Sequence, residues 1–184
     1  MLSQQLANPP HNRFPIGVQV FEPADIHRLN AALGWLGLDS PDDARLELDG
    51  IAANQQSHPA VLEARWLLCA REKNWCEALV VARRELAEAP KLASGWLHQA
   101  YALRRIDGGG LSQAWDALLP AAEKFPKEAI IAFNLSCYAC QMNRLEDART
   151  WFHRAVETGG KEMIKKMALA DEDLKPLWHE IEKL

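Results

Sequence analysis

The chain has 184 residues, of which 48% are hydrophobic and 25% charged, as expected for one soluble domain or one short repeat array. Its net charge is −4 and its lysines and arginines are scattered, which disfavours nucleic acid and anionic membranes as partners. There is no cationic start and no run of about 18 apolar residues, so we expect no signal peptide, no membrane anchor and a cytoplasmic protein. Four unevenly spaced cysteines fit a reducing compartment better than a disulfide framework.

Residues 1–23 carry three early prolines and no helical periodicity, which predicts a loosely ordered leader. Its last part, FPIGVQVF, could lie extended against the rest of the chain. From Pro23 onward, apolar residues recur every three or four positions, which predicts a helix over about 24–37. Ser40 as a cap, Pro41 and the two carboxylates that follow predict a second helix from about 41 to about 55.

The same pair of helices is expected three more times. The predicted pairs lie near 59–72 and 75–88, near 92–105 and 111–124, and near 128–141 and 144–157. One alanine marks each pair, and these alanines are spaced 34, 36 and 34 residues apart: Ala44, Ala78, Ala114 and Ala148. Four residues after each alanine, on the same helical face, stands another apolar residue: Leu48, Ala82, Leu118 and Phe152. This period predicts helical hairpins stacked as a solenoid with a concave surface for a partner.

The irregular middle spacing predicts an insertion in the turn of the third hairpin, at residues 108–110, which are three glycines. Pro90 and Pro126 are expected to close the second and third units, whereas the first unit has no closing proline. After Gly160, Asp173 is expected to cap a last helix that covers the end of the stack. The inner face of that helix would carry Leu174, Leu177, Trp178 and Ile181.

Two stretches carry a family resemblance. The third unit reads WLHQAY at 96–101 with Ala114, Ala121 and Pro126, and the fourth reads FNLSCY at 133–138 with LEDA at 145–148, Phe152 and Ala155. This pattern resembles the tetratricopeptide repeat over about residues 24–160, as units 24–58, 59–91, 92–127 and 128–160. The resemblance implies an all-α, right-handed helical solenoid of about four such units, with capping helices in residues 161–184.

The resemblance also implies a non-enzymatic scaffold or adaptor that holds a peptide or helix of a partner protein in its concave groove. Carried over position by position, the groove would be lined by Glu63, Leu67, Arg71, Leu97, Tyr101, Arg104, Arg105, Ile130, Phe133, Asn134, Cys137 and Gln141. The arginines favour an acidic or carboxylate-bearing segment, because guanidinium groups bind carboxylates through paired hydrogen bonds. The lysine and asparagine clamp of members that hold a C-terminal carboxylate is not expected, since only Asn134 fits it.

The cysteines and histidines are better explained as packing residues than as catalytic or metal-binding residues. Cys137 and Cys140 would lie three residues apart on one helix, with β-carbons roughly 5–6 Å apart, too far for a disulfide. Cys69 and Cys76 lie two repeats away, so a four-cysteine zinc site is not expected. No histidines have metal-binding spacing and no phosphate loop is present, so we expect no metal, no cofactor and no enzymatic activity.

Two alternatives to the adaptor hypothesis stay open: a subunit that assembles with copies of itself, and a thiol-redox or other enzyme. Among the tryptophans, Trp35, Trp75, Trp96 and Trp151 are expected in buried positions between helices. Trp66 and Trp115 are hard to place inside, so an exposed one would be a candidate contact residue.

Overall fold

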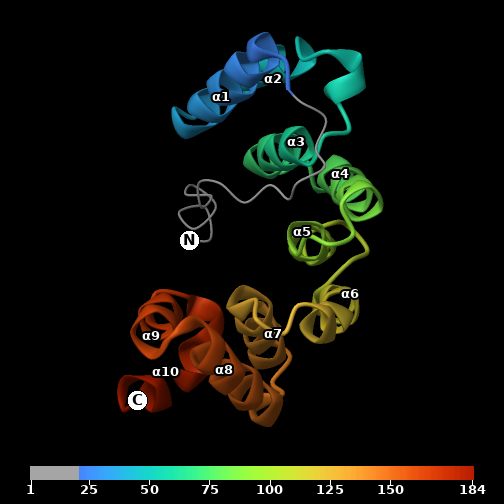
Figure 1. The fold of residues 1–184 in the computed structure, drawn as a ribbon. Coiled ribbons are helices and arrows are strands. Elements are labelled where there is room, and N and C mark those ends of the chain that lie inside the picture. Colours follow the sequence, from blue (N-terminus) through green and yellow to red (C-terminus); the bar gives the residue numbers. More distant parts are fainter. Residues whose placement is uncertain (1–20) are drawn as a thin grey trace. The chain divides into compact units, whose positions relative to one another are not determined.

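A computed structural model of the chain describes residues 21–184, so nearly all of the predicted leader lies outside the described residues (Figure 1). Residues 21–184 form helices joined by short connections and contain no strand, which confirms the all-α class. The elements are α1 (Pro23–Gly37), α2 (Pro41–Asp49), η2 (Ala53–Gln55), α3 (Pro59–Arg71), α4 (Trp75–Glu88), α5 (Ser94–Leu103), α6 (Leu111–Lys124), α7 (Ala129–Gln141), α8 (Leu145–Gly159), α9 (Lys161–Leu169), η3 (Glu172–Leu177) and α10 (Trp178–Glu182); η2 and η3 are 3-10 helices.

The described chain forms two compact units, an N-terminal unit that ends at His98 and a C-terminal unit that begins at Gln99, within α5. In the N-terminal unit α1 packs along α2 and α3 packs along α4, and α3 also contacts α1 and α2 (Figure 1). In the C-terminal unit α7 contacts α6, α8 and η3, while α9, η3 and α10 contact one another. Within residues 21–184, no helix combines the length and the apolar character that crossing a bilayer requires.

The four spaced alanines form the centre of the helical packing. All four are completely buried, and the apolar residues one turn later are buried as well. The buried stripe continues seven residues after each alanine, at Ile51, Glu85, Ala121 and Ala155. The expected register is therefore confirmed: small residues at these positions let neighbouring helices approach closely.

Three of the hairpins turn in the same way. Asp39, Lys73 and Asn143 follow the ends of α1, α3 and α7 and have φ near +60°. In each turn, the next residue donates its N–H to a carbonyl five positions back, as Asn74 does to Cys69 at 2.9 Å. This is the Schellman arrangement, which satisfies the last carbonyls of a helix and reverses the chain. The third hairpin departs from it at the predicted insertion: Gly108 and Gly110 have φ of +74° and +140°, and a Cβ on Gly109 would lie 2.1 Å from the Leu103 carbonyl oxygen.

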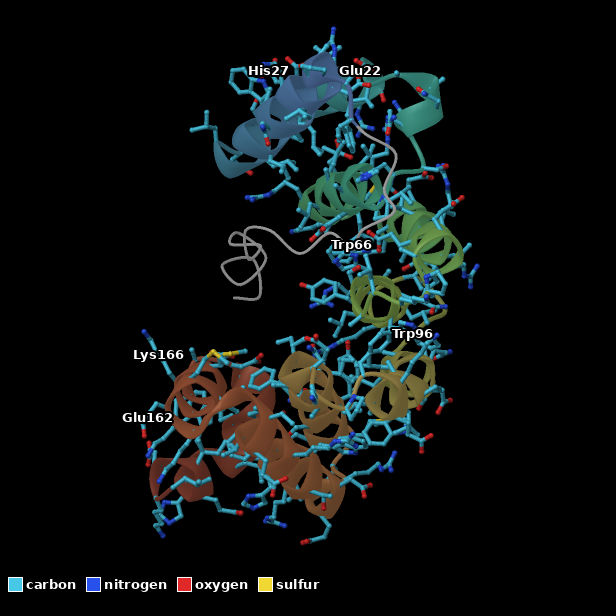
Figure 2. All side chains as sticks on the ribbon, in the orientation of Figure 1. Glu22, His27, Trp66, Trp96, Glu162 and Lys166 are labelled. Carbon is cyan, nitrogen blue, oxygen red and sulfur yellow. The ribbon has the colours of Figure 1, made fainter. Side chains whose placement is uncertain are left out.

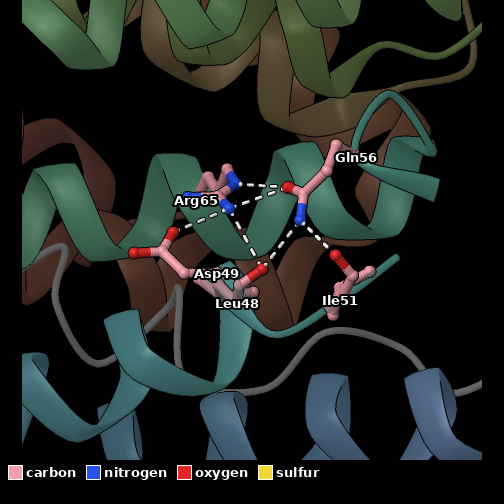
Figure 3. A network of polar contacts seen from close by, with 5 residues as sticks. All are labelled: Leu48, Asp49, Ile51, Gln56 and Arg65. Atoms are coloured by element: carbon pink, nitrogen blue, oxygen red, sulfur yellow. Dashed lines mark hydrogen bonds and ion pairs between the residues drawn. The ribbon is translucent and has the colours of Figure 1, made fainter. Parts of the chain in front are cut away.

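The second helix ends at Asp49, earlier than predicted, and a polar network fixes the connection to α3 (Figure 3). Arg65 on α3 donates to the Leu48 carbonyl and the Asp49 carboxylate, both at 3.0 Å, and to the Gln56 side chain at 2.7 Å. The Gln56 amide in turn donates to the carbonyls of Leu48 and Ile51. This network fixes the connection between the first and second helical hairpins, which has no closing proline. It does so because it satisfies carbonyl groups that have no hydrogen-bond partner within α2.

Candidate binding surfaces

The N-terminal unit presents a row of leucines on the first helices of its hairpins. Leu29 and Leu33 on α1 precede Glu63 and Leu67 on α3 by 34 residues, the spacing of Ala44 and Ala78, and Leu97 on α5 follows Glu63 by the same spacing. All of these side chains are half-buried. We call Leu29, Leu33, Leu67 and Leu97, together with Glu63, the leucine face. The sequence prediction included its α3 and α5 members but missed Leu29 and Leu33, which the 34-residue period could have supplied.

The chemistry of the leucine face is mostly apolar. Leu29, Leu33 and Leu67 pack against the buried cluster of α1, α2 and α3 on one side and are partly exposed on the other. Burial raises the pKa of the Glu63 carboxyl, the neighbouring charge of His98 lowers it, and that of Glu85 raises it. Covering a neutral carboxyl costs less free energy than covering a charged one.

Arg71, one turn beyond Leu67, provides the exposed charge beside the leucine face. It donates to the Asp39 carboxylate at 3.0 Å, and the Asp39 side chain is 75% exposed. An ion pair this open to solvent contributes little stability, about 0–1 kcal/mol. A carboxylate from a partner could therefore replace Asp39 at low cost.

A buried aromatic and polar group lies behind Glu63. Trp66 extends from α3 toward α5, and its ring stacks on that of His98 with the ring centroids 3.9 Å apart (Figure 2). His98 Nδ1 lies 2.6 Å from Glu85 Oε2, and both residues are buried. A carboxylate in the interior needs such a partner, because burial without one costs several kcal/mol. One signal in the sequence could have found Glu85: it stands where the other units have Ile51, Ala121 and Ala155.

The two tryptophans predicted to be hard to bury are both buried, with Trp66 0% and Trp115 7% exposed, so this expectation was wrong. The indole of Trp66 is covered by His98, and that of Trp115 by the edge of Trp151 and the guanidinium of Arg144. Trp35, expected inside, is instead 37% exposed. Helical spacing locates the apolar face of a helix but does not reveal which neighbours cover a large ring.

In the C-terminal unit, the residues at the equivalent repeat positions contact another segment of the same chain. Cys137 and Gln141 follow Leu67 and Arg71 by the distance that separates Ala78 from Ala148. Gln141 donates its side-chain N–H to the Asp173 carbonyl at 3.0 Å, and the Cys137 sulfur lies 3.9 Å from the Asp171 carboxylate. The segment around η3 therefore lies where the groove of the fourth unit was predicted.

Arg104 binds this segment most strongly. Its guanidinium donates to both carboxylate oxygens of Asp173, one of them at 2.9 Å, and its pKa is raised chiefly by that pair. Arg105 instead stacks 3.5 Å from the ring centroid of Tyr101 and donates to the Tyr101 carbonyl. One of the arginines predicted to line the groove thus binds a carboxylate within the chain. Asp173 is not the predicted helix cap: Asp171 caps η3 by accepting from the Asp173 N–H, since Asp173 is held by Arg104.

The remaining predicted groove residues lie on α7, which is covered on all sides. Residues 131–140 are all buried, Phe133 and Cys137 among them, and Asn134 donates to the Ile130 carbonyl. Ile130 is half-buried. A helix that is apolar all round is typical of a core helix.

The η3 segment is an integral part of the C-terminal unit. Leu174, Leu177 and Ile181 are each at most 2% exposed. Burying three such side chains contributes roughly 5–9 kcal/mol, which a partner would have to replace in order to reach α7. The binding role predicted for the α7 residues stays a prediction, and one that the packing makes costly.

Cys137, Asp171 and Asp173 also form a group with metal-ligating atoms within 4.8 Å of one another. Arg104 takes up both oxygens of Asp173, however. Burial raises the pKa of the Cys137 thiol well above its usual value and also raises that of Asp171. A divalent cation needs the thiolate and free carboxylate oxygens, so these residues fit an arginine better than a metal.

A cavity of about 200 Å³ lies between α8 and α10, floored by Phe152, Leu177 and Ile181. Arg149 at its rim donates to Glu180 through two nitrogens, at 2.8 and 2.7 Å. Small-molecule sites usually enclose about 300–1,000 Å³. The cavity is thus smaller than a typical substrate or cofactor site.

Comparison with known protein families gives no match for this chain, and no curated protein matches it either. The interpretation of its function therefore depends on the residues and surfaces described above.

Proposed function

We propose that the chain is a tetratricopeptide-like adaptor that binds an extended segment of a partner protein on the leucine face. The proposal includes the finer architecture implied by the resemblance, a right-handed solenoid of about four helical hairpins, and no enzymatic activity. The partner segment would contribute apolar side chains to the leucines and a carboxylate to Arg71.

One observation supports the proposal: the C-terminal unit already holds an acidic segment, the start of the 3-10 helix η3, at the equivalent positions. There Cys137, Gln141 and Arg104 contact residues 171–173 through a backbone carbonyl and carboxylates. Leu67 and Arg71 occupy the same register in the N-terminal unit. Covering the half-exposed leucines would stabilise a complex by about 25 cal/mol for each Å² of apolar surface removed from water.

The thiol-redox alternative has less support, because the thiolate is the reactive form and burial raises the pKa of Cys137 and Cys140. The self-assembly alternative has one favourable observation. Leu38 and Leu46, in the α1–α2 hairpin, are 74% and 70% exposed, and exposed leucines can mark a contact between copies.

The test compares proteins captured by the wild-type chain and by two matched variants. Leu67→Asn with Arg71→Glu changes the leucine face and its neighbouring charge. Leu46→Asn with Arg83→Glu makes the same two changes at exposed positions elsewhere. We expect a partner that the wild type and the control retain and that the leucine-face variant binds about tenfold more weakly or worse.

Circular dichroism checks that both variants keep the helical content of the wild type. Equal retention by the two variants would contradict the assignment of the leucine face. Light scattering across a concentration range tests the alternative: a stable oligomer that Leu46→Asn dissociates would favour self-assembly over an adaptor.

A further inference from the structure

Glu63 is the one charged side chain of α3 that has no partner of opposite charge among residues 21–184. The other two, Arg65 and Arg71, bind the carboxylates of Asp49 and Asp39. No hydrogen bond from the described residues reaches the Glu63 carboxyl, although Glu63 is half-buried in the leucine face. A carboxyl in this position has lost part of its hydration without gaining a donor, so it favours a donor supplied by a bound partner.

The groups behind Glu63 do not supply that donor. His98, whose charge lowers the pKa of the Glu63 carboxyl, has its Nδ1 2.6 Å from Glu85 Oε2 and its ring stacked on Trp66. Glu85 Oε1 is buried and accepts no hydrogen bond from the described residues. Two carboxyl groups thus lie near a single imidazole, so this part of the leucine face favours a positive charge.

Glu63, Leu67 and Arg71 form an ordered row along α3. They follow one another at intervals of four residues, so they lie on one side of the helix at steps of about 6 Å. An extended chain rises about 6.6 Å for every two residues, and its alternate side chains point to the same side. Every second side chain of an extended segment that lies along α3 therefore meets one member of this row.

We propose that the leucine face selects an extended segment with a cationic side chain, an apolar side chain and a carboxylate at alternate positions. The cation binds Glu63, the apolar side chain packs on Leu67, and the carboxylate replaces Asp39 at Arg71. The cation and the carboxylate are four residues apart, because a spacing of three or five would place one of them on the far side of the segment. This inference rests on the proposed adaptor function and specifies the sequence pattern of its partner.

The experiment measures the binding of synthetic peptides to the full chain by fluorescence anisotropy. Two peptides carry arginine, leucine and glutamate at alternate positions among threonines, one with the arginine first and one with it last, because the spacing fits either chain direction. In the matched peptides the glutamate is moved one position closer to the arginine. We expect the chain to bind one alternating peptide at least about fivefold more tightly than its shifted counterpart.

A double-mutant cycle tests the contact with Glu63 itself. Replacing the peptide arginine by glutamine should weaken binding to the wild-type chain about fivefold, but should change binding to Glu63→Gln by less than about twofold. Glu88→Gln removes an exposed carboxylate at the end of α4 and is the matched control. It should respond to the arginine as the wild type does.

Two results would overturn this inference. One is that the alternating peptides bind no better than the shifted ones, which includes no binding of either. The other is that Glu63→Gln keeps the wild-type preference for arginine. The adaptor function itself fails differently, because its test changes Leu67 and Arg71 and leaves Glu63 intact: a partner lost by that double variant would uphold the adaptor even if the peptides gave either of these two results.

Discussion

At the scale of single residues, the turns of the hairpins depend on three positions with left-handed backbone. Asp39 and Asn143 tolerate this conformation because their short polar side chains suit it, whereas Lys73 has no such advantage. The Schellman hydrogen bonds around Lys73 are nonetheless formed, with the Lys73 N–H donating to the Ala70 carbonyl at 3.2 Å. The helical packing of α3 and α4 therefore imposes a conformation that lysine alone would avoid.

Replacing Lys73 by glycine should stabilise the chain. Glycine adopts positive φ without strain, and Lys73 is exposed, so we expect a gain of about 0.5–1 kcal/mol in the free energy of unfolding and a rise of a few degrees in Tm. Urea unfolding measures the change in the free energy of unfolding, and thermal unfolding measures the change in Tm. Asn143→Gly is the matched control and should change stability less, because asparagine already suits the turn. A loss of stability in Lys73→Gly would contradict this account.

At the scale of elements, two ion pairs join segments that are far apart in the sequence. Arg104, directly after α5, holds Asp173 in η3, and their side chains are 19% and 20% exposed. Arg149 and Glu180 form a similar two-nitrogen pair between α8 and α10, but those side chains are 33% and 50% exposed. The two pairs differ mainly in burial, so they should differ in their contribution to stability.

Asp173→Asn should loosen η3 markedly, because it leaves the Arg104 charge partly buried without its full partner. We expect the free energy of local opening in residues 170–178 to fall by about 2 kcal/mol. Amide hydrogen exchange in peptides from this region should therefore be roughly 30-fold faster. Glu180→Gln, the control, should change the hydrogen exchange around α10 much less, because solvent screens that more exposed pair. Equal effects of the two substitutions would show that burial does not govern these pairs.

At the scale of the whole molecule, the reactivity of the four cysteines measures the packing of both units. Cys69, Cys137 and Cys140 are buried, whereas Cys76 at the start of α4 is exposed. Burial raises the pKa of Cys69 to about 11 and raises that of Cys137 and Cys140 as well. Their thiols are therefore both covered and protonated at neutral pH.

A thiol reagent at neutral pH should label one cysteine of the native chain rapidly and the other three at least about 100-fold more slowly, since those three must wait for local opening. Mass spectrometry should locate the rapid label on Cys76. Cys76→Ser should abolish the rapid phase and leave the slow one. Rapid labelling of Cys137 or Cys140 in that variant would instead support the thiol-redox alternative.

The periodicity of the chain was sufficient to predict most of the helices. The expected helices at 75–88 and 111–124 match α4 and α6 residue for residue. The second helix was predicted too long, because the apolar pattern continues past Gly50 whereas the Arg65 network ends α2 at Asp49. Prolines, glycines and apolar spacing act locally, so a helix and its inner face can be inferred from the residues that form it.

The tertiary structure decided what covers each face. Local spacing placed Trp66, Glu85 and Asp173 on their helices but could not show that Trp66 stacks on His98, that Glu85 binds His98 or that Asp173 binds Arg104. These contacts join residues 13 to 69 positions apart. Such pairings follow from the way the helices pack. The sequence by itself thus determined the repeating helices and their register, whereas only packing determined that the chain's own η3 segment covers α7 while the leucine face of the N-terminal unit is left half-exposed.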